Sequence, residues 1–382
     1  MHRYLASHIE RDLQRKMVFV GGPRQVGKTT LARSLLPGNK SDPEDTTSPH
    51  PAYFNWDLPA ARRKILDVEL PKNEKLLVLD EIHKYAKWRN LLKGIYDTYK
   101  DKYSFLITGS ARLDYYRRGG DSLLGRYHYY RLHPLSAGEL LANKYEFSID
   151  QLLTRGGFPE PFFAADARDY HRWQRDRLSR VVREDLVDLE RVNEISSLQL
   201  LVDALPMRVG APLSVKNLAE DLLVAPKTVS RWIEILENLY VCYRIAPYGA
   251  PRIRAVKKEQ KLYLWDWSMC TDEGARFENL VASQLLKECH FIEDTEGVEM
   301  ELRYIRDADK REVDFVVLRN KQPIYGVECK LKDSSISPHL KYFSERTPVP
   351  KWYQVHLGDA HYEKDNIEVL PFLTFVKEMG LR

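Results

Sequence analysis

The sequence predicts an α/β protein with a parallel-sheet domain, a helical middle region and a second α/β domain. Three observations predict it: an apolar strand that runs into a glycine loop at 17–29, a stretch of helical spacing at 166–204, and two apolar strands that carry acids at 312–332. A chain of 382 residues exceeds one ordinary domain. The predicted domains are 1–145, 146–270 and 271–382.

The composition indicates a globular protein, with 43% hydrophobic and 30% charged residues. A net charge of +4 permits contact with nucleic acid but does not argue for it. The four cysteines form neither a CxxC pair nor a zinc spacing, which indicates free thiols in a reducing compartment. The N-terminus lacks a signal-peptide core, and no apolar run approaches the roughly 18 residues of a membrane span. We therefore expect a cytoplasmic protein without membrane contact.

The first motif is a phosphate-binding loop, GPRQVGKT, which fits G-x-x-x-x-G-K-[ST] at every fixed position. Its glycines let backbone N–H groups close around phosphates, Lys28 reaches the β/γ oxygens, and the Thr29 hydroxyl binds magnesium. The following helix, 29–36, directs its positive end at the anion. The predicted nucleotide-binding residues of the loop are Gly22, Pro23, Arg24, Gln25, Val26, Gly27, Lys28, Thr29 and Thr30.

The segment LLVLDE at 76–81 ends in two acids, and its apolar run predicts a strand that is buried on both faces of a parallel sheet. We expect Asp80 to hold magnesium and Glu81 to polarise the attacking water. A strand that ends in surface acids is the alternative, which the neighbouring loop disfavours. Further strands are expected within 52–57 and 103–112.

Hydrolysis also needs a cation for the charge of the transition state. Arg126 is the candidate arginine finger, although an ordinary solvated arginine is the alternative. The competing residues are Arg112, Arg117 and Arg118.

The middle region predicts a helix-turn-helix followed by two strands. Ser214 caps a helix that ends near Leu222, and a second helix covers about 227–239. Strands at 240–247 and 261–267 would form the wings of a winged helix. Such modules bind either DNA or protein, and both readings stay open. The inner face of the second helix is Val229, Trp232, Ile233 and Leu236, and its exposed start carries Lys227 and Arg231.

The acids of the last third are predicted to meet across a β-hairpin. If Asn320-Lys321-Gln322 forms the turn, Asp314 lies opposite Glu328 on one face. Two carboxylates this close repel each other unless a cation lies between them, and magnesium or manganese favours oxygen ligands. Lys330 would orient water or offset phosphate charge, and Glu278 would complete the metal shell. A structural ion pair between Asp314 and Lys330 is the alternative.

Together these motifs resemble the bacterial and archaeal AAA+ ATPases that carry a C-terminal conserved domain of unknown function with a winged helix and a PD-(D/E)xK restriction-endonuclease-like core. The resemblance rests on GPRQVGKT, LLVLDE, ITGSAR, LLGRYHYYRLHPLSAGE, GGFPE, GARFENLV and EVDFVV…GVECK. It implies a five-stranded parallel ATPase core and a residue that senses the γ-phosphate, either Ser110 or Thr108. The second sensor arginine of such ATPases has no clear counterpart. The implied nuclease-type residues are Glu278, Asp314, Glu328 and Lys330.

These observations predict an ATP-hydrolysing protein coupled to a DNA-binding, metal-dependent nuclease-like module. The expected cofactors are ATP with Mg²⁺ in the first domain and Mg²⁺ or Mn²⁺ in the last. DNA is an expected partner, and a homo-oligomer is plausible. The alternative is an ATP-dependent switch or scaffold whose nuclease-like domain is non-catalytic.

Overall fold

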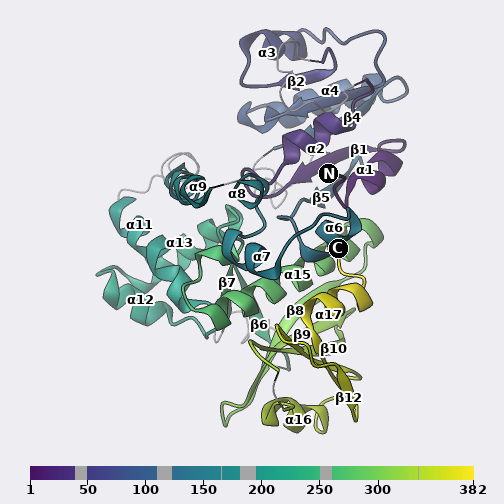
Figure 1. Ribbon diagram of the computed structural model, residues 1–382. Helices are drawn as coiled ribbons and strands as arrows, with labels where there is room; N and C mark the ends of the chain where they lie inside the picture. Colours follow the sequence, from purple (N-terminus) through teal and green to yellow (C-terminus); the bar gives the residue numbers. More distant parts are fainter. Residues whose placement is uncertain (39–49, 110–122, 165, 181–194, 250–259, 334) are drawn as a thin grey trace. The chain divides into compact units, whose positions relative to one another are not determined.

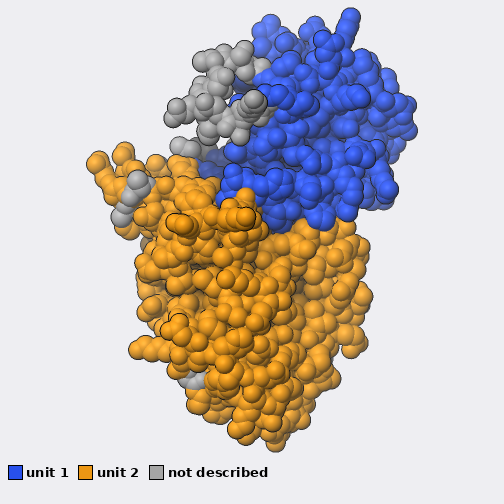
Figure 2. Space-filling view, turned by 45° about the vertical axis from the view of Figure 1, so that its right-hand side comes forward, with its two compact units in different colours: residues 1–133 blue, residues 134–382 orange. Residues whose placement is uncertain are grey.

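The computed structural model describes residues 1–38, 50–109, 123–164, 166–180, 195–249, 260–333 and 335–382. The chain forms two compact units, Met1–His133 and Pro134–Arg382, which Figure 2 colours separately. The predicted domains 1–145, 146–270 and 271–382 stay predictions, because the division into compact units does not test domain boundaries. No helix in the described ranges combines the length and apolar character needed to cross a membrane.

Unit 1 is built on one parallel sheet, which confirms the predicted α/β fold of the N-terminal part (Figure 1). Its strands are β1 (Met17–Gly21), β2 (Tyr53–Asn55), β3 (Leu76–Asp80), β4 (Ser104–Thr108) and β5 (Tyr127–Arg131), in the order β2-β3-β4-β1-β5. Its helices include α1 (Ala6–Asp12), α2 (Lys28–Ser34), α3 (Pro59–Leu66) and α4 (Trp88–Tyr99). Because the strands are parallel, the ends of β1, β3 and β4 meet at one edge of the sheet.

The first half of unit 2 is helical, as predicted. It contains α6 (Ala137–Ala142), α7 (Ile149–Arg155), α8 (Pro159–Phe163), α9 (Ala167–Arg180), α11 (Ile195–Ala204), α12 (Val215–Asp221) and α13 (Pro226–Asn238). The Ser214 side chain accepts the Asn217 N–H and caps α12. The predicted inner face of α13 is buried, since Val229, Trp232, Ile233 and Leu236 are all at most 4% exposed.

One arginine of α9 is buried within unit 2. Arg177 is 3% exposed, and its guanidinium lies 4.0 Å from the Phe158 ring centre. It faces the buried Asp266 at 3.8 Å. Spacing along one helix could not show this, because Asp266 comes from a distant part of the chain.

A mixed eight-stranded sheet forms the second half of unit 2. Its strands are β6 (Cys242–Pro247), β7 (Lys261–Leu264), β8 (Met300–Arg306), β9 (Glu312–Arg319), β10 (Gln322–Lys330), β11 (Trp352–His356), β12 (Tyr362–Lys364) and β13 (Ile367–Pro371). They follow the order β12-β13-β11-β10-β9-β8-β6-β7. The predicted wing strands, β6 and β7, thus join the acid-bearing strands through pairing of β6 with β8. This shared sheet explains why the two predicted domains form one unit.

Helices cover both faces of this sheet. The long helix α15 (Glu273–Glu296) contacts β8, β9 and β10, and its Phe277 packs on Phe372 of α17 (Phe372–Glu378). On the opposite face, α16 (Pro338–Ser344) contributes to a core cluster. That cluster contains Val313, Val316, Leu318, Leu340, Phe343 and Trp352.

The hairpin between β9 and β10 has the predicted register at Asp314 and Glu328 but a different turn. Its turn has only two residues, Asn320 and Lys321, with φ of 50° and 66°, because Arg319 pairs with Gln322. An extra residue on β10, between Pro323 and Tyr325, then shifts the pairing by one. The predicted three-residue turn is therefore wrong.

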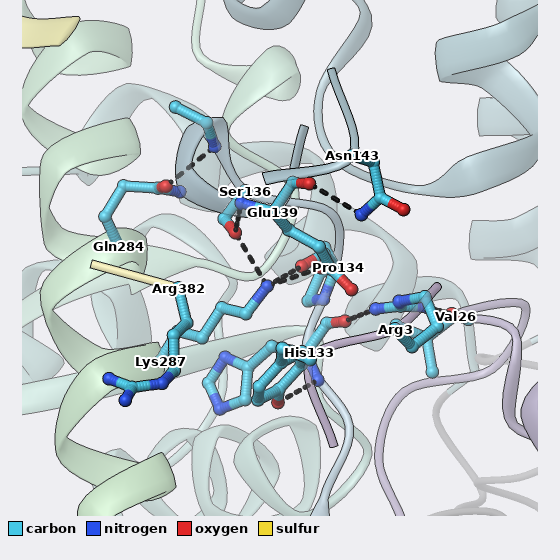
Figure 3. Close-up of polar contacts among 12 residues, drawn as sticks. Arg3, Val26, His133, Pro134, Ser136, Glu139, Asn143, Gln284, Lys287 and Arg382 are labelled. Atoms are coloured by element: carbon cyan, nitrogen blue, oxygen red, sulfur yellow. Dashed lines mark hydrogen bonds and ion pairs between the residues drawn. The ribbon is translucent and has the colours of Figure 1, made fainter. Parts of the chain in front are cut away.

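A buried ion pair attaches the start of unit 2 to helix α15 (Figure 3). Lys287 Nζ donates to Glu139 Oε2 at 2.7 Å, to Ser136 Oγ at 2.8 Å and to the Pro134 carbonyl at 3.2 Å. Gln284, one turn away on α15, accepts the Ala137 N–H. Both charged side chains are 1% exposed, so the segment that leads into α6 is held by desolvated polar contacts.

We expect Lys287→Met to destabilise the protein by about 3–5 kcal/mol, because it leaves the Glu139 carboxylate buried without its cation. Urea unfolding of the full chain measures this change. The double variant Lys287→Met/Glu139→Gln is the control and should recover a large part of the loss. A single variant as stable as the wild type would contradict this account of the ion pair.

Candidate functional site

The phosphate-binding loop follows β1 and makes a tight turn into helix α2. Gly22 and Gly27 have φ of 139° and 97°, which side chains rarely adopt. A Cβ on Gly22 would lie 2.4 Å from the Leu132 carbonyl oxygen, so the close approach of β5 also requires glycine. Lys28 Nζ donates to the carbonyls of Pro23 at 2.6 Å and Gly22 at 3.0 Å.

The structure brings the loop together with the acid of β3. The Thr29 hydroxyl donates to Asp80 Oδ2 at 2.9 Å, although the two residues are 51 positions apart. Asp80 is 4% exposed, whereas Thr29 is exposed. Thr29 and Asp80 thus present oxygen ligands of the type that Mg²⁺ prefers, beside a loop shaped for phosphates.

Two further hydroxyl groups hold Asp80. Thr108, at the end of β4, donates to Oδ1 at 2.5 Å, and Tyr53 of β2 donates to Oδ2 at 2.6 Å. Burial, with the charge of Asp80, raises the pKa of Tyr53, so this phenol stays protonated as a donor. The hydroxyl proton of Thr108 is directed to Asp80. The other proposed γ-phosphate contact, Ser110, lies outside the described residues.

Glu81 occupies an unusual backbone position directly after β3. Its φ of 59° is left-handed, which is rare for a residue other than glycine or asparagine. Burial raises the pKa of its carboxyl, and the charge of Asp80 adds to this effect while Lys84 opposes it. A carboxylate of raised basicity beside the loop suits the predicted role of polarising water.

Arg126 lies at the end of the sheet opposite the phosphate-binding loop. Its carbonyl accepts the N–H of Met17, at the start of β1, whereas the loop follows the end of that strand. Its guanidinium forms a bidentate ion pair with Asp97 at 2.8 and 3.0 Å. This position does not suit action on a nucleotide bound to the same chain, and a role toward a neighbouring copy stays a prediction. Arg112, Arg117 and Arg118 fall outside the described residues.

Sequence reasoning missed two residues that support the loop. Tyr53 lay in a predicted strand but carried no assigned role. Arg3 is 8% exposed and donates to the carbonyls of Val26 and His133 at 2.7 and 2.5 Å (Figure 3). No motif marks either residue, since their partners are distant in sequence.

In unit 2, Asp314 lies in a β-bulge of β9. Arg303 pairs with Val316 and Ile305 with Val313, so Asp314 and Phe315 both lie opposite Tyr304. On the other side of β9, Val327 pairs with Phe315, so Glu328 and Asp314 come next. Asp314 Oδ2 accepts the N–H of Cys329 at 2.8 Å. The predicted juxtaposition of the two acids is therefore present.

Glu328 is the most enclosed acid of this group, with 4% exposure. Its Oε1 accepts from Lys330 Nζ at 2.7 Å, and its Oε2 is buried without a hydrogen-bond partner in the structure. Burial raises the pKa of Glu328 to about 7, and the charge of Asp314 contributes. An orphaned carboxylate oxygen beside a second carboxylate fits a bound cation.

Glu278 has other partners. Its Oε1 accepts from the Tyr263 hydroxyl at 2.7 Å and lies 3.3 Å from Lys261 Nζ. Burial raises its pKa to about 8, followed by the charge of Asp314. Lys261, at the start of β7, also pairs with Glu312 and was not singled out by sequence reasoning. Lys261 comes from a predicted wing strand, and no spacing in the sequence indicates that it forms ion pairs with these acids.

The predicted three-carboxylate shell of Glu278, Asp314 and Glu328 does not assemble. In the part of the chain that the structure describes, one group alone places three candidate ligand atoms within 4.8 Å of one another. It consists of His361, Glu368 and Glu378, on the other edge of the sheet. Glu368 in that group is already paired with Lys351 and His361.

The start of helix α13 presents a modest basic surface. Lys227 and Arg231 are exposed on the first turns of α13, as predicted, while Thr228 and Ser230 are half-buried. Lys216 and Arg208 lie on neighbouring elements but pair with Glu220 and Asp221.

Unit 1 thus combines a parallel sheet, a glycine loop after β1 and a β3 acid bonded to the loop threonine, which is the architecture of a P-loop nucleotide-binding domain. Residues 14–141 match the family model described as AAA domain, so the chain carries an AAA domain at its N-terminus. Residues 146–273 and 273–375 match two domains of unknown function, DUF8612 and DUF4143.

The chain is similar to uncharacterized proteins of several microorganisms. It is 27% identical over 267 residues to one from Mycobacterium tuberculosis, covering 69% of this chain and 57% of that protein. It therefore spans little more than half of that relative. A protein of Methanocaldococcus jannaschii is 23% identical over 430 residues, covering 97% of this chain and 86% of that protein.

Among solved structures, one similar chain is the Orc1 protein of Aeropyrum pernix in complex with DNA. The TM-score is 0.34 at 15% identity, and the match covers 74% of this chain and 93% of that one.

The raised pKa values of Glu278 and Glu328 predict that stability falls with rising pH in EDTA. The folded protein retains a proton on Glu278 between its ordinary 4.5 and about 8, where the unfolded chain has released it. Stability therefore declines through this range. Thermal unfolding between pH 6 and 9 should show a smaller decline for Glu278→Gln than for the wild type. The matched control is Glu273→Gln, an exposed glutamate on the same helix, which should follow the wild type. Equal declines in all three proteins would contradict the prediction.

Proposed function

We propose that the protein is a magnesium-dependent ATPase whose nucleotide site is the loop at 22–30 with Asp80 and Glu81. The contact between the Thr29 hydroxyl and Asp80, at 2.9 Å, carries this proposal. It joins the two motif residues that would hold Mg²⁺ beside a loop whose backbone suits phosphates. Bound Mg²⁺ would neutralise charge on the β- and γ-phosphate oxygens.

Residues of the protein would bind the phosphates, activate the water and stabilise the transition state. Lys28, now bonded to loop carbonyls, would turn to the phosphate oxygens, while the loop N–H groups bind the anion. Glu81 would orient water and accept its proton, for which a raised pKa is suited. Since Arg126 is paired with Asp97 away from the loop, an arginine from a second copy would complete the site. A homo-oligomer is thus part of the proposal.

We expect Lys28→Ala to lower kcat/KM for ATP by about 10²–10³-fold, because one electrostatic contact to the transferring phosphate is lost. Phosphate release with Mg²⁺-ATP measures this. Lys100→Ala, an exposed lysine of the same unit, is the control and should behave as the wild type. Undiminished turnover in Lys28→Ala would discard the assignment of the site.

A second activity is proposed for unit 2, a metal-dependent cleavage of DNA phosphodiesters. The observation that favours it is the partnerless, buried Oε2 of Glu328 beside Asp314, with Lys330 on the other oxygen. Asp314 and Glu328 would hold Mg²⁺ or Mn²⁺, which would supply Lewis acidity, and Lys330 would offset phosphate charge. The arrangement of α12, α13, β6 and β7 supports a winged helix that offers Lys227 and Arg231 to the DNA backbone.

We expect Mn²⁺-dependent cleavage of plasmid, linear or branched DNA that Asp314→Ala abolishes, because the metal loses one of its carboxylates. Gel analysis of the products measures it, and the exposed Asp359→Ala is the control. Without any Asp314-dependent cleavage, the alternative would stand: an ATP-dependent switch or scaffold for a protein or DNA partner.

A further inference from the structure

Lys261 is a desolvated cation inside the acidic group of unit 2. Its side chain is 1% exposed, and its Nζ lies 2.5 Å from Glu312 Oε1, 3.3 Å from Glu278 Oε1 and 3.8 Å from Asp314 Oδ1. The ring of Tyr304, opposite the bulge that carries Asp314, lies 5.4 Å from the same Nζ. Three carboxylates and an aromatic ring therefore surround one ammonium group.

The position of this ammonium is set by the backbone. Lys261 begins β7, where it pairs with Ile245 of β6, and it forms a bridge to Pro212 on its other side. Burial by itself lowers the pKa of Lys261, but the three surrounding carboxylates outweigh it and raise that pKa. The ion pairs with Glu312 and Asp314 thus place one ammonium group at a defined point of the cluster.

Glu278 is satisfied within the protein. Both Tyr263 and Lys261 reach its Oε1, at 2.7 and 3.3 Å. Its Oε2 lies against Gly210, where an added Cβ would come within 2.8 Å of that oxygen. Gly210 has φ of 76°, so this close backbone approach depends on glycine. The two oxygens of Glu278 are therefore already in contact with Lys261, Tyr263 and Gly210.

The capacity to bind another cation lies with Asp314 and Glu328. Glu328 Oε2 is buried without a partner, and Asp314 uses Oδ2 for the Cys329 N–H. Glu312 is balanced by Arg306, whose Nη1 lies 3.0 Å from its Oε2. Because Lys261 and Lys330 already bring two positive charges to these acids, a second divalent ion beside the first would be repelled.

We propose that the Lys261 ammonium takes the place of one metal ion in the acid cluster, so that the cluster binds a single hard divalent cation through Asp314 and Glu328 and without Glu278. This proposal rests on the metal-dependent site proposed for unit 2. It assigns Lys261 as the residue that sets how many ions the site accepts. Lys261 is a positioning residue, because it acts on the carboxylates and not on a substrate.

The test is Mn²⁺ binding to the full chain without nucleotide, measured by calorimetry and by the electron paramagnetic resonance of bound Mn²⁺. All proteins carry His361→Ala and Asp80→Asn, which remove the exposed histidine cluster and the acid of the nucleotide site as competing sites. The reference protein should bind one Mn²⁺ that Asp314→Ala abolishes. Glu278→Gln should keep that ion with an affinity within about twofold, since its carboxylate is not a ligand.

Replacement of Lys261 by the uncharged, similarly long methionine should change the number of Mn²⁺ ions that the protein binds. Lys261→Met should bind a second Mn²⁺, because Glu278 and Asp314 lose their internal cation. Circular dichroism establishes that each variant is folded, and Glu278→Gln tests the proposal even if Lys261→Met does not fold.

Four results would overturn the proposal: two ions in the reference protein, no Asp314-dependent ion, loss of the ion in Glu278→Gln as in Asp314→Ala, or a single ion in folded Lys261→Met. DNA cleavage is measured separately. One ion in the reference protein and two in Lys261→Met, without cleavage, would reject the nuclease activity but retain the role of Lys261, whereas cleavage with two ions in the reference protein would do the reverse.

Discussion

A carboxylate placed on an apolar strand must find proton donors or cations, because its desolvation is otherwise too costly. Both units of this protein are arranged around that constraint. In unit 1, three hydroxyl groups from three different elements donate to Asp80. In unit 2, the ammonium of Lys261 lies among three carboxylates. The hydroxyl donors bring no positive charge to Asp80, whereas Lys261 brings a cation to the acids of unit 2.

Strand order decides which of these groups meet. The parallel arrangement β3-β4-β1 puts the ends of the three strands at one edge, so that the loop, Asp80 and Thr108 converge. In the mixed sheet of unit 2, two irregularities in strand pairing set the positions of the acids. A bulge at Asp314 and Phe315 places Val313 and Val316 in the same core cluster, and an extra residue in β10 restores the register of Glu328.

The segment that follows β5 is held to helix α15 of unit 2 by buried hydrogen bonds. β5 pairs with β1, the strand that leads into the phosphate-binding loop. The chain then passes Pro134 into α6, which Lys287 and Gln284 of α15 hold by buried hydrogen bonds. The same helix carries Glu278 two turns earlier. The hydrogen bonds of Lys287 and Gln284 to this segment are buried, which favours one fixed arrangement of α6 on α15.

The sequence by itself determined the features that depend on local pattern. The glycine loop, the buried β3 strand, the Ser214 cap and the apolar face of α13 all follow from spacing over a few residues, and the structure contains each of them. The opposition of Asp314 and Glu328 was also predictable, since the turn and the later extra residue compensate each other.

Only the tertiary structure decided which distant partners satisfy the buried charges. Lys261 and Tyr263 reach Glu278 from a strand assigned to another domain, Tyr53 reaches Asp80 across the sheet, and Arg177 is buried against Asp266. These pairs are fixed by strand pairing and packing between segments far apart in sequence. Electrostatic partners leave no periodic signal along the chain, and therefore sequence patterns locate the acids but not the groups that neutralise them.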